Sequence, residues 1–171
     1  MLAMLSDSEI DLSAFDYLNP PVGIEQIRQA NPQRFEFEML SGIVHLDPKK
    51  QLIIGFKDLP HDDFWVRGHM PGFPLLPGVL MCEAAAQMCG YYYVAQKIGD
   101  PGNLLGLGGI DETRFVRTVR PGERLVLVGT GVKIHRRMTK FRVIGYVDKE
   151  NVFETLVTGV PIGKMRELCS A

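Results

Sequence analysis

The spacing of hydrophobic positions changes along the chain, and each spacing predicts a different kind of element. Residues 23–30 have apolar side chains at helical intervals and stop before Pro32, which predicts a short helix. From Phe35 the pattern becomes that of two strands, at about 35–46 and 51–56, with turn chemistry between them at 47–50. Residues 58–77 contain four prolines and two glycines, so a structured loop is expected there.

The strongest helix signal begins at Pro77-Gly78, runs to about Ile98 and is stopped by the Gly99–Gly102 turn. Apolar or small residues occupy nearly every side of this helix, which is typical of a helix enclosed by the rest of the fold. Because the same stretch contains Glu83 in its middle, we interpret it as a buried helix and expect no membrane span.

After Gly102 the pattern predicts strands to the end of the chain, at residues 104–110, 111–119, 123–134, 139–147 and 152–161. No helix lies between them, and parallel neighbours would need long crossovers, so we expect antiparallel pairing. The prediction is an α+β fold in which one long antiparallel sheet wraps around one buried helix.

Length, composition and charge limit the function classes. The 171 residues fit one domain, and residues 1–23 form an N-terminal extension that ends in a Pro/Gly-rich stretch. The net charge of −1 excludes a globally basic nucleic-acid binder. Three cysteines with no metal-binding spacing indicate a reducing compartment, and the absence of a basic n-region before Asp7 leads us to expect a cytoplasmic protein.

Candidate chemistry gathers between Gly68 and Gln87. His69 lies in a rigid Pro/Gly loop and has a side chain suited to proton transfer near neutral pH. Gly78 and Val79 would present unpaired amides at the start of the enclosed helix, where a developing oxyanion could be held. Glu83 is a carboxylate on an otherwise apolar helix, and is costly to bury unless it is paired, protonated or used. The competing interpretation is structural: a loop histidine and a hydrogen-bonded glutamate.

Other features have plainer interpretations. The glycines at 106–109 lack the helix and lysine of a phosphate loop, so nucleotide binding is not expected. The three tyrosines at 91–93 are interpreted as core or dimer packing. Three further histidines are interpreted as structural or solvent-facing: His45, His61 and His135. A local excess of basic residues could be a solvated sheet face or a docking surface for an acidic partner: Arg114, Arg117, Arg120, Lys133, Arg136, Arg137 and Lys140.

The run from Gly68 to Gln87, GHMPGFPLLPGVLMCEAAAQ, closely resembles the signature of the 3-hydroxyacyl-[acyl-carrier-protein] dehydratases, which have the hot-dog fold. Residues 24–37 (IEQIRQANPQRFEF) and 114–123 (RFVRTVRPGE) resemble the family on both sides of this run. The resemblance covers residues 24–162, interpreted as the hot-dog domain, with 163–171 as a C-terminal tail. Met70 and Gln33 stand where the family usually has Phe and His.

The resemblance implies that His69 and Glu83 are catalytic, that they come from opposite subunits of a dimer, and that Gly78 and Val79 face the thioester carbonyl. It implies loss of water from (3R)-3-hydroxyacyl thioesters carried on acyl carrier protein, with no metal or cofactor. The expected assembly is a homodimer at least, and a trimer of dimers is an option. Two other functions stay open: a hot-dog acyl thioesterase, and a non-catalytic acyl-binding subunit.

Overall fold

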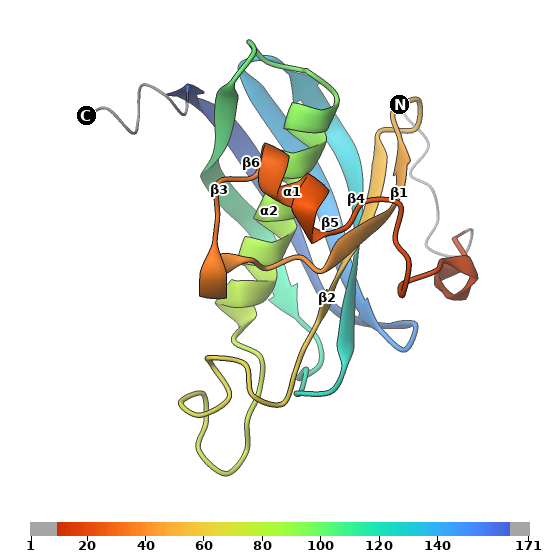
Figure 1. Cartoon of the computed structure of the whole chain (residues 1–171), viewed down its shortest axis with the longest axis vertical. Helices are drawn as coiled ribbons and strands as arrows, with labels where there is room; N and C mark the ends of the chain where they lie inside the picture. Colours follow the sequence, from red (N-terminus) through yellow and green to blue (C-terminus); the bar gives the residue numbers. More distant parts are fainter. Residues whose placement is uncertain (1–9, 165–171) are drawn as a thin grey trace.

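The computed structural model describes residues 10–164, and Figure 1 shows a sheet curled around one central helix. Its helices are α1 (Ile24–Ala30) and α2 (Gly78–Ala95), with short 3-10 turns at Leu12–Ala14 and Phe35–Phe37. Its strands are β1 (Gly42–Asp47), β2 (Leu52–Asp58), β3 (Asn103–Phe115), β4 (Arg124–His135), β5 (Met138–Val147) and β6 (Glu150–Lys164).

The six strands form one sheet in the order β1-β2-β4-β5-β6-β3, and every neighbouring pair is antiparallel. The sheet wraps around α2, and α1 lies on the side of α2 that the sheet leaves open (Figure 1). This confirms the predicted fold class. The strand order brings β3, which follows α2 in the chain, to the edge opposite β1.

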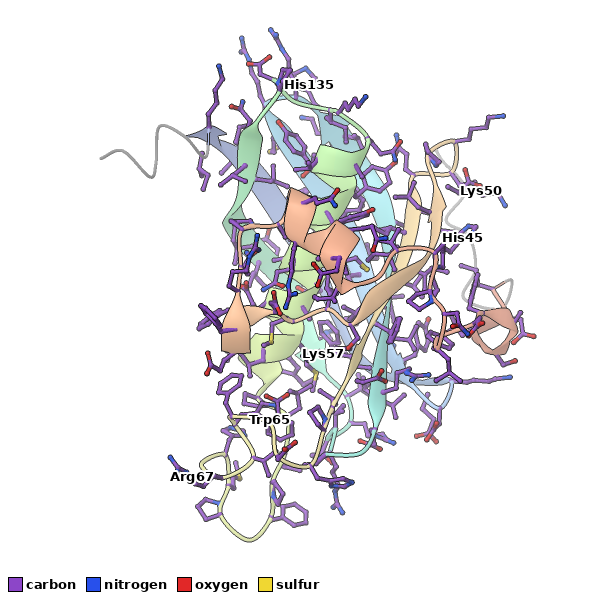
Figure 2. The ribbon with its side chains drawn as sticks, viewed as in Figure 1. His45, Lys50, Lys57, Trp65, Arg67 and His135 are labelled. Atoms are coloured by element: carbon purple, nitrogen blue, oxygen red, sulfur yellow. The ribbon has the colours of Figure 1, made fainter. Side chains whose placement is uncertain are left out.

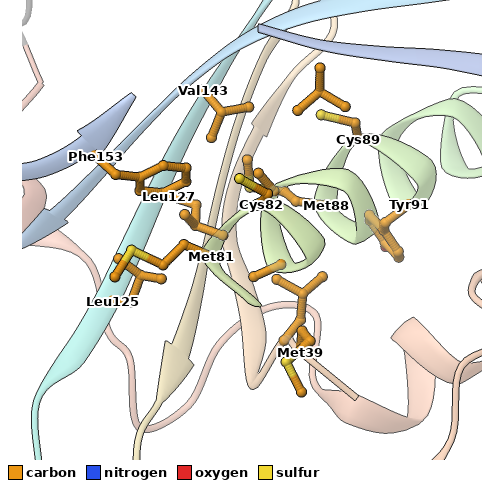
Figure 3. Packing of buried hydrophobic residues seen from close by; sticks show 14 of the residues in the cluster. Met39, Met81, Cys82, Met88, Cys89, Tyr91, Leu125, Leu127, Val143 and Phe153 are labelled. Carbon is orange, nitrogen blue, oxygen red and sulfur yellow. The ribbon is translucent and has the colours of Figure 1, made fainter. Parts of the chain in front are cut away.

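The core forms where α2 meets the inner face of the sheet (Figure 3). Met81, Cys82 and Met88 of α2 are at most 5% exposed and share one cluster with Leu127 and Phe153 of the strands. Full burial of a side chain of this size contributes about 1.5–3 kcal/mol. The apolar side chains on all sides of α2 therefore pack against the rest of the protein, and almost no side of the helix is left to solvent.

Two local predictions were wrong. The strands expected at 104–110 and 111–119 are the single strand β3, which is interrupted by irregularities that change its register with β6. One of them lies at Glu112, whose φ is 50° and whose carboxylate pairs with Arg142 at 2.7 Å. A bulge bends a strand without ending it, so polar residues there do not mark a boundary. Residues Phe35–Phe37 form a 3-10 turn and not the start of a strand.

Residues 10–22, here called the N-terminal strap, cross the outer face of the sheet. The strap's Ile10, Leu12, Phe15 and Tyr17 pack against a second apolar cluster on β1, β2 and β4. Val22 then forms an isolated antiparallel bridge with Ile43 of β1. The strap therefore covers apolar surface that the sheet would otherwise expose. The second cluster consists of Val44, Leu52, Ile54, Phe56, Val126 and Val128.

Tyr17 holds the strap through both its ring and its hydroxyl. Its ring meets Phe56 edge-on with centroids 5.2 Å apart, and the Arg124 guanidinium lies 4.9 Å from the Tyr17 centroid. Its hydroxyl donates to the Leu12 carbonyl at 2.8 Å, and burial raises the pKa of that hydroxyl. Edge-on aromatic pairs and cation contacts of this kind add to the area that the ring buries.

We expect Tyr17→Ala to lower the free energy of unfolding by about 1–3 kcal/mol, because it removes a partly buried ring from a packed site. The measurement is urea denaturation followed by circular dichroism. Leu18→Ala is the matched control, since Leu18 is 85% exposed and its loss should change the free energy by less than about 0.5 kcal/mol. Equal effects of the two variants would contradict the packing role of the strap.

Candidate active site

His69 lies in the loop of residues 59–77, which joins β2 to the start of α2 and extends beyond that end of the helix (Figures 1 and 2). The loop is anchored at two points. The amides of Gly68 and His69 donate to the carbonyl of the buried Trp65 at 3.2 and 2.8 Å. The Leu76 amide donates to the Val119 carbonyl at 2.7 Å. The absence of helix and strand predicted for this segment is confirmed.

Within residues 10–164 one hydrogen bond orients the His69 ring. Its Nδ1 lies 2.8 Å from the carbonyl oxygen of Leu75, and the Leu75 amide donates back to the His69 carbonyl at 3.0 Å. Because a carbonyl oxygen only accepts, Nδ1 carries the hydrogen and the neutral ring has its lone pair on Nε2. The loop thus holds His69 in the tautomer that a general base at Nε2 requires.

The first turn of α2 supplies unpaired amides. The amides of Leu80 and Met81 donate to the Pro77 carbonyl at 2.9 and 3.4 Å, whereas within residues 10–164 no backbone carbonyl accepts from Gly78 or Val79. These two amides stand at the positive end of an 18-residue helix, where they can stabilise a negative charge.

A side chain at position 78 would crowd the ring of Phe115. A Cβ on Gly78 would lie 2.7 Å from the ring of Phe115, which itself stacks on Phe153 with centroids 6.2 Å apart. Val79, by contrast, is 74% exposed. The Gly78 amide is therefore held between the loop and the end of β3, and the Val79 side chain points away from the core.

Glu83 lies on the second turn of α2 and is half-buried. One of its carboxylate oxygens, Oε1, accepts a hydrogen bond of 2.8 Å from Nε2 of Gln87, one turn further along the helix. Among the described residues no basic side chain forms an ion pair with Glu83. The amide of Gln87 therefore sets the direction of the carboxylate without neutralising its charge.

Gln87 is only 4% exposed, and its side chain bonds to three groups. Besides Glu83, its Nε2 donates to the Phe37 carbonyl at 2.7 Å, and its Oε1 accepts from the Met39 amide at 3.0 Å. The Gln87 backbone carbonyl also accepts from Nδ2 of Asn31 at 2.9 Å. A buried amide with this many partners is rigid, so Gln87 positions Glu83.

The segment bonded to Gln87 is fixed on its other side by an ion pair. Both carboxylate oxygens of Glu38 accept from the Arg28 guanidinium of α1, at 2.6 and 2.9 Å. This hydrogen bonding lowers the pKa of Glu38, so its carboxylate stays ionised at neutral pH. Helix α1 thus supports the site indirectly, because its Arg28 fixes the segment of residues 37–39 to which the Gln87 side chain is hydrogen-bonded.

The structure brings Gly78, Val79 and Glu83 together on one helix and places His69 on the loop that leads into it. Within the described part of this single chain, no hydrogen bond or ion pair joins His69 to Glu83. Sequence reasoning gave no role to Gln87. A polar residue four positions after Glu83 on an apolar helix was the available signal, because side chains at that spacing are neighbours.

Other groups add no further chemistry to this site. Cys82 and Cys89 are free and buried, and burial raises the pKa of both thiols; Cys169 lies outside the described residues. In residues 10–164 no three metal-ligating side chains gather. No helix of that part is long and apolar enough to span a membrane.

The model of the FabA-like domain family matches residues 31–156, so the chain belongs to that family. The family and the architecture together define a hot-dog protein. Among curated proteins, the chain is 34% identical over 135 residues to the 3-hydroxyacyl-[acyl-carrier-protein] dehydratase FabZ of Bacillus cereus (strain AH820), covering 79% of this chain and 92% of the relative. The FabZ of Salmonella arizonae is 35% identical over 133 residues, with coverages of 77% and 87%.

A solved structure supports the fold. The chain is similar to the dehydratase heterocomplex ApeI:P from Xenorhabdus doucetiae with a TM-score of 0.67 and 14% identity, covering 85% of this chain and 97% of that one. At this level of identity the likeness concerns the fold alone. The family resemblance and the fold predicted from the sequence are both confirmed.

We expect Gln87→Met to lower the free energy of unfolding by about 1–3 kcal/mol, because it leaves the buried Met39 amide and the partly buried Phe37 carbonyl without their partner. The measurement is urea denaturation. Gln29→Met on the exposed side of α1 is the matched control and should change stability by less than about 0.5 kcal/mol. A Gln87→Met protein as stable as the control would show that this hydrogen-bond network contributes little.

Proposed function

We propose that this protein is a dehydratase that removes water from (3R)-3-hydroxyacyl thioesters and yields the trans-2-enoyl thioesters. The main support for this proposal is the sequence identity of 34–35% with FabZ dehydratases over nearly their whole length. The geometry agrees with this chemistry, because a loop histidine with a free Nε2, an unpaired amide and an oriented carboxylate are the groups that such an elimination needs.

In the proposed mechanism, Nε2 of His69 takes a proton from C2, next to the thioester carbonyl. The negative charge that develops on the carbonyl oxygen is stabilised by the Gly78 amide and the positive end of α2, with Val79 as a second donor. Glu83 first takes up a proton from solvent and then delivers it, directly or through a water molecule, to the C3 hydroxyl, which leaves as water; Glu83 ends as the carboxylate and His69 as the imidazolium, which returns its proton to solvent. The C2–C3 double bond forms as the C3–O bond breaks, so atoms and charge balance.

Two other functions fit the site and the family less well. A thioesterase would need a carboxylate that activates water, and the ordered His69 loop would have no task in it. A non-catalytic acyl-binding subunit would not need a histidine held in one tautomer. The departures at Met70, which is 51% exposed, and Gln33 leave the groups assigned to proton transfer unchanged.

We also propose that two copies share each site. β3 is an edge strand, so one side of its backbone has no partner within the described chain. Exposed apolar side chains lie on β3 or directly after it: Leu107, Ile110, Phe115 and Val116. An exposed apolar edge of this kind favours pairing with a second copy, which would carry its His69 loop to the Glu83 of this chain. A trimer of dimers remains a prediction.

The proposed carrier is acyl carrier protein, attracted by part of the basic set. Within the described residues, Arg117 is paired with Glu123 and Glu150 at 2.8 and 3.2 Å. Arg120 lies over the ring of Phe73 in the His69 loop, 4.5 Å from its centroid. His135, next to Arg136 and Arg137, lies at the opposite end of the molecule from Trp65 and Arg67 of the loop (Figure 2).

We therefore assign docking to the residues beside the site, above all Arg114 and Arg120, and not to the turn between β4 and β5. The basic residues that the sequence groups into one run are divided by the fold between two ends of the protein. A cytoplasmic location is part of this proposal, because that is where a carrier-dependent enzyme of lipid synthesis would find its substrate.

We expect His69→Ala and Glu83→Gln each to lower kcat about 10²–10⁴-fold, since each removes one proton-transfer group. The assay is hydration of crotonyl-pantetheine followed by loss of enoyl absorbance. His135→Ala is the control histidine variant and should retain wild-type rates. Near-normal rates in both variants would contradict the proposed roles of His69 and Glu83 in proton transfer.

Mixing the two inactive proteins separates a shared site from one within a single chain. If each site takes His69 from one subunit and Glu83 from the other, random exchange of subunits restores about a quarter of the wild-type sites. No recovery after subunit exchange, verified by mass spectrometry, would place both groups in the same chain.

For the carrier, we expect Arg120→Ala to lower kcat/KM for carrier-linked substrate roughly three- to tenfold at low salt and to leave pantetheine-linked substrate unaffected. The wild-type preference for the carrier-linked substrate should also weaken as salt is added. Arg137→Ala, at the other end of the molecule, is the matched control. Equal losses on both substrates would mean that Arg120 supports the loop and not the carrier.

A further inference from the structure

The connection between β3 and β4 is bonded to both ends of the loop that carries His69. This connection, residues 119–123, is here called the β3–β4 turn. It starts at the fully buried Val119 and leads into β4 at Arg124. Figure 1 shows it beside the base of the loop of residues 59–77. Because one end of the turn is fixed in the core and the other in the sheet, the turn is a stable support for that loop.

The first residue of the loop is held by two reciprocal hydrogen bonds. The Leu59 amide, directly after β2, donates to the Glu123 carbonyl at 3.1 Å, and the Gly122 amide donates to the Leu59 carbonyl at 2.7 Å. Gly122 has a φ of 89°, and a Cβ on it would lie 2.9 Å from the ring of His61. Glycine at this position therefore lets the loop pack directly against the backbone of the turn.

The last part of the loop is bonded to the same turn. The Leu76 amide donates to the Val119 carbonyl at 2.7 Å, and the preceding residue, Leu75, supplies the carbonyl that orients the His69 ring. The conformation of the β3–β4 turn therefore sets the separation of the two ends of the loop. A change in that conformation displaces Leu75, and with it the imidazole whose position the chemistry requires.

The Glu123 side chain holds the turn in its conformation. Its Oε2 accepts a hydrogen bond of 2.6 Å from the Arg120 backbone amide, and its Oε1 accepts one of 2.8 Å from the Arg117 guanidinium. The Glu123 amide also donates to the Arg120 carbonyl at 3.3 Å. Hydrogen bonds to a carboxylate are stronger than those between neutral groups. The contact uses the backbone of Arg120, so it is independent of the Arg120 side chain proposed for docking.

We propose that Glu123 is a positioning residue for the dehydration: by closing the β3–β4 turn it fixes both ends of the loop and so places Nε2 of His69. The inference rests on the proposed dehydratase function and deepens it. Within residues 10–164 the Glu123 side chain bonds only to Arg117 and Arg120, so it acts on the reaction through the loop.

The test compares Glu123→Ala with Glu150→Ala in the full-length protein. Glu150 contacts the same guanidinium, that of Arg117, at 3.2 Å, but it lies at the start of β6, outside the β3–β4 turn, and is the matched control. The assay is hydration of crotonyl-pantetheine. We expect Glu123→Ala to lower kcat per folded protein about 10–100-fold with less than about a twofold change in KM, because a misplaced reacting group slows the chemical step. Glu123→Gln keeps one acceptor oxygen and should lose less, and Glu150→Ala should keep the wild-type kcat.

Two further measurements distinguish positioning from other roles. The pH profile of kcat/KM in Glu123→Ala should keep its wild-type shape at a lower height, and a changed shape would make Glu123 itself a proton-transfer group and overturn the positioning role. Hydrogen exchange followed by mass spectrometry should be faster in peptides from residues 59–77 of Glu123→Ala, while peptides from β5 exchange at the wild-type rate.

The outcomes separate this inference from the proposed function. A wild-type protein that hydrates no enoyl thioester overturns the proposed function, whereas hydrogen exchange still tests whether Glu123 holds the loop. A folded Glu123→Ala protein with the wild-type kcat, or with wild-type exchange in the loop, overturns the role of Glu123 alone. If circular dichroism shows that Glu123→Ala does not fold, Glu123→Gln decides, and a kcat equal to that of Glu150→Ala then overturns the inference.

Discussion

Enclosure of α2 is the constraint on which the site depends. The sheet and α1 surround the helix, so its side chains must be apolar or must find partners inside the protein. Between Gly78 and Ala95 only Glu83 carries a charge, and Gln87, one turn away, bonds to it. A charged group in such a setting loses much of its freedom to reorient and part of its hydration. Both changes make it a better-defined proton-transfer group than the same residue on an open surface.

The same enclosure explains how distant segments are tied to the chemistry. Gln87 joins α2 to the chain at Phe37 and Met39, and the ion pair of Glu38 with Arg28 joins that chain to α1. These contacts hold the carboxylate from one side, while the loop with His69 is held separately at Trp65 and Leu76. The two groups proposed for proton transfer are thus held on independent supports, which suits the proposed site completed by a second subunit.

Much of this arrangement could be predicted from the sequence, for identifiable reasons. The enclosed helix and the antiparallel sheet follow from periodicity and from the lack of crossover segments. His69 and Glu83 could be proposed because their residue types are unusual in a Pro/Gly loop and on an apolar helix. Gly78 and Val79 could be proposed because they stand at the start of that helix, where backbone amides lack intrahelical partners. The partners could not be predicted, because the Leu75 carbonyl on His69 and the Phe37 carbonyl on Gln87 depend on loop paths that no local pattern encodes.

The strand prediction failed at β3 for a related reason: charged residues at 111–112 suggest a boundary, but tertiary pairing with β6 carries the strand through an irregularity. The basic residues show the same limit. Their closeness in sequence suggests one surface, whereas the long strand β4 carries them to opposite ends of the sheet. Sequence patterns predict local secondary structure well. They predict which distant residues become neighbours only where two strands are joined by a tight turn.

The bridge between Val22 and Ile43 also affects how the sheet can grow. It caps the outer side of β1, and the two prolines just before it have no amide hydrogens to offer an incoming strand. Strand addition is therefore obstructed at one border of the sheet and open at the other. With a single receptive border, pairing through sheet edges stops at two copies, so this route does not lead to open-ended fibril growth.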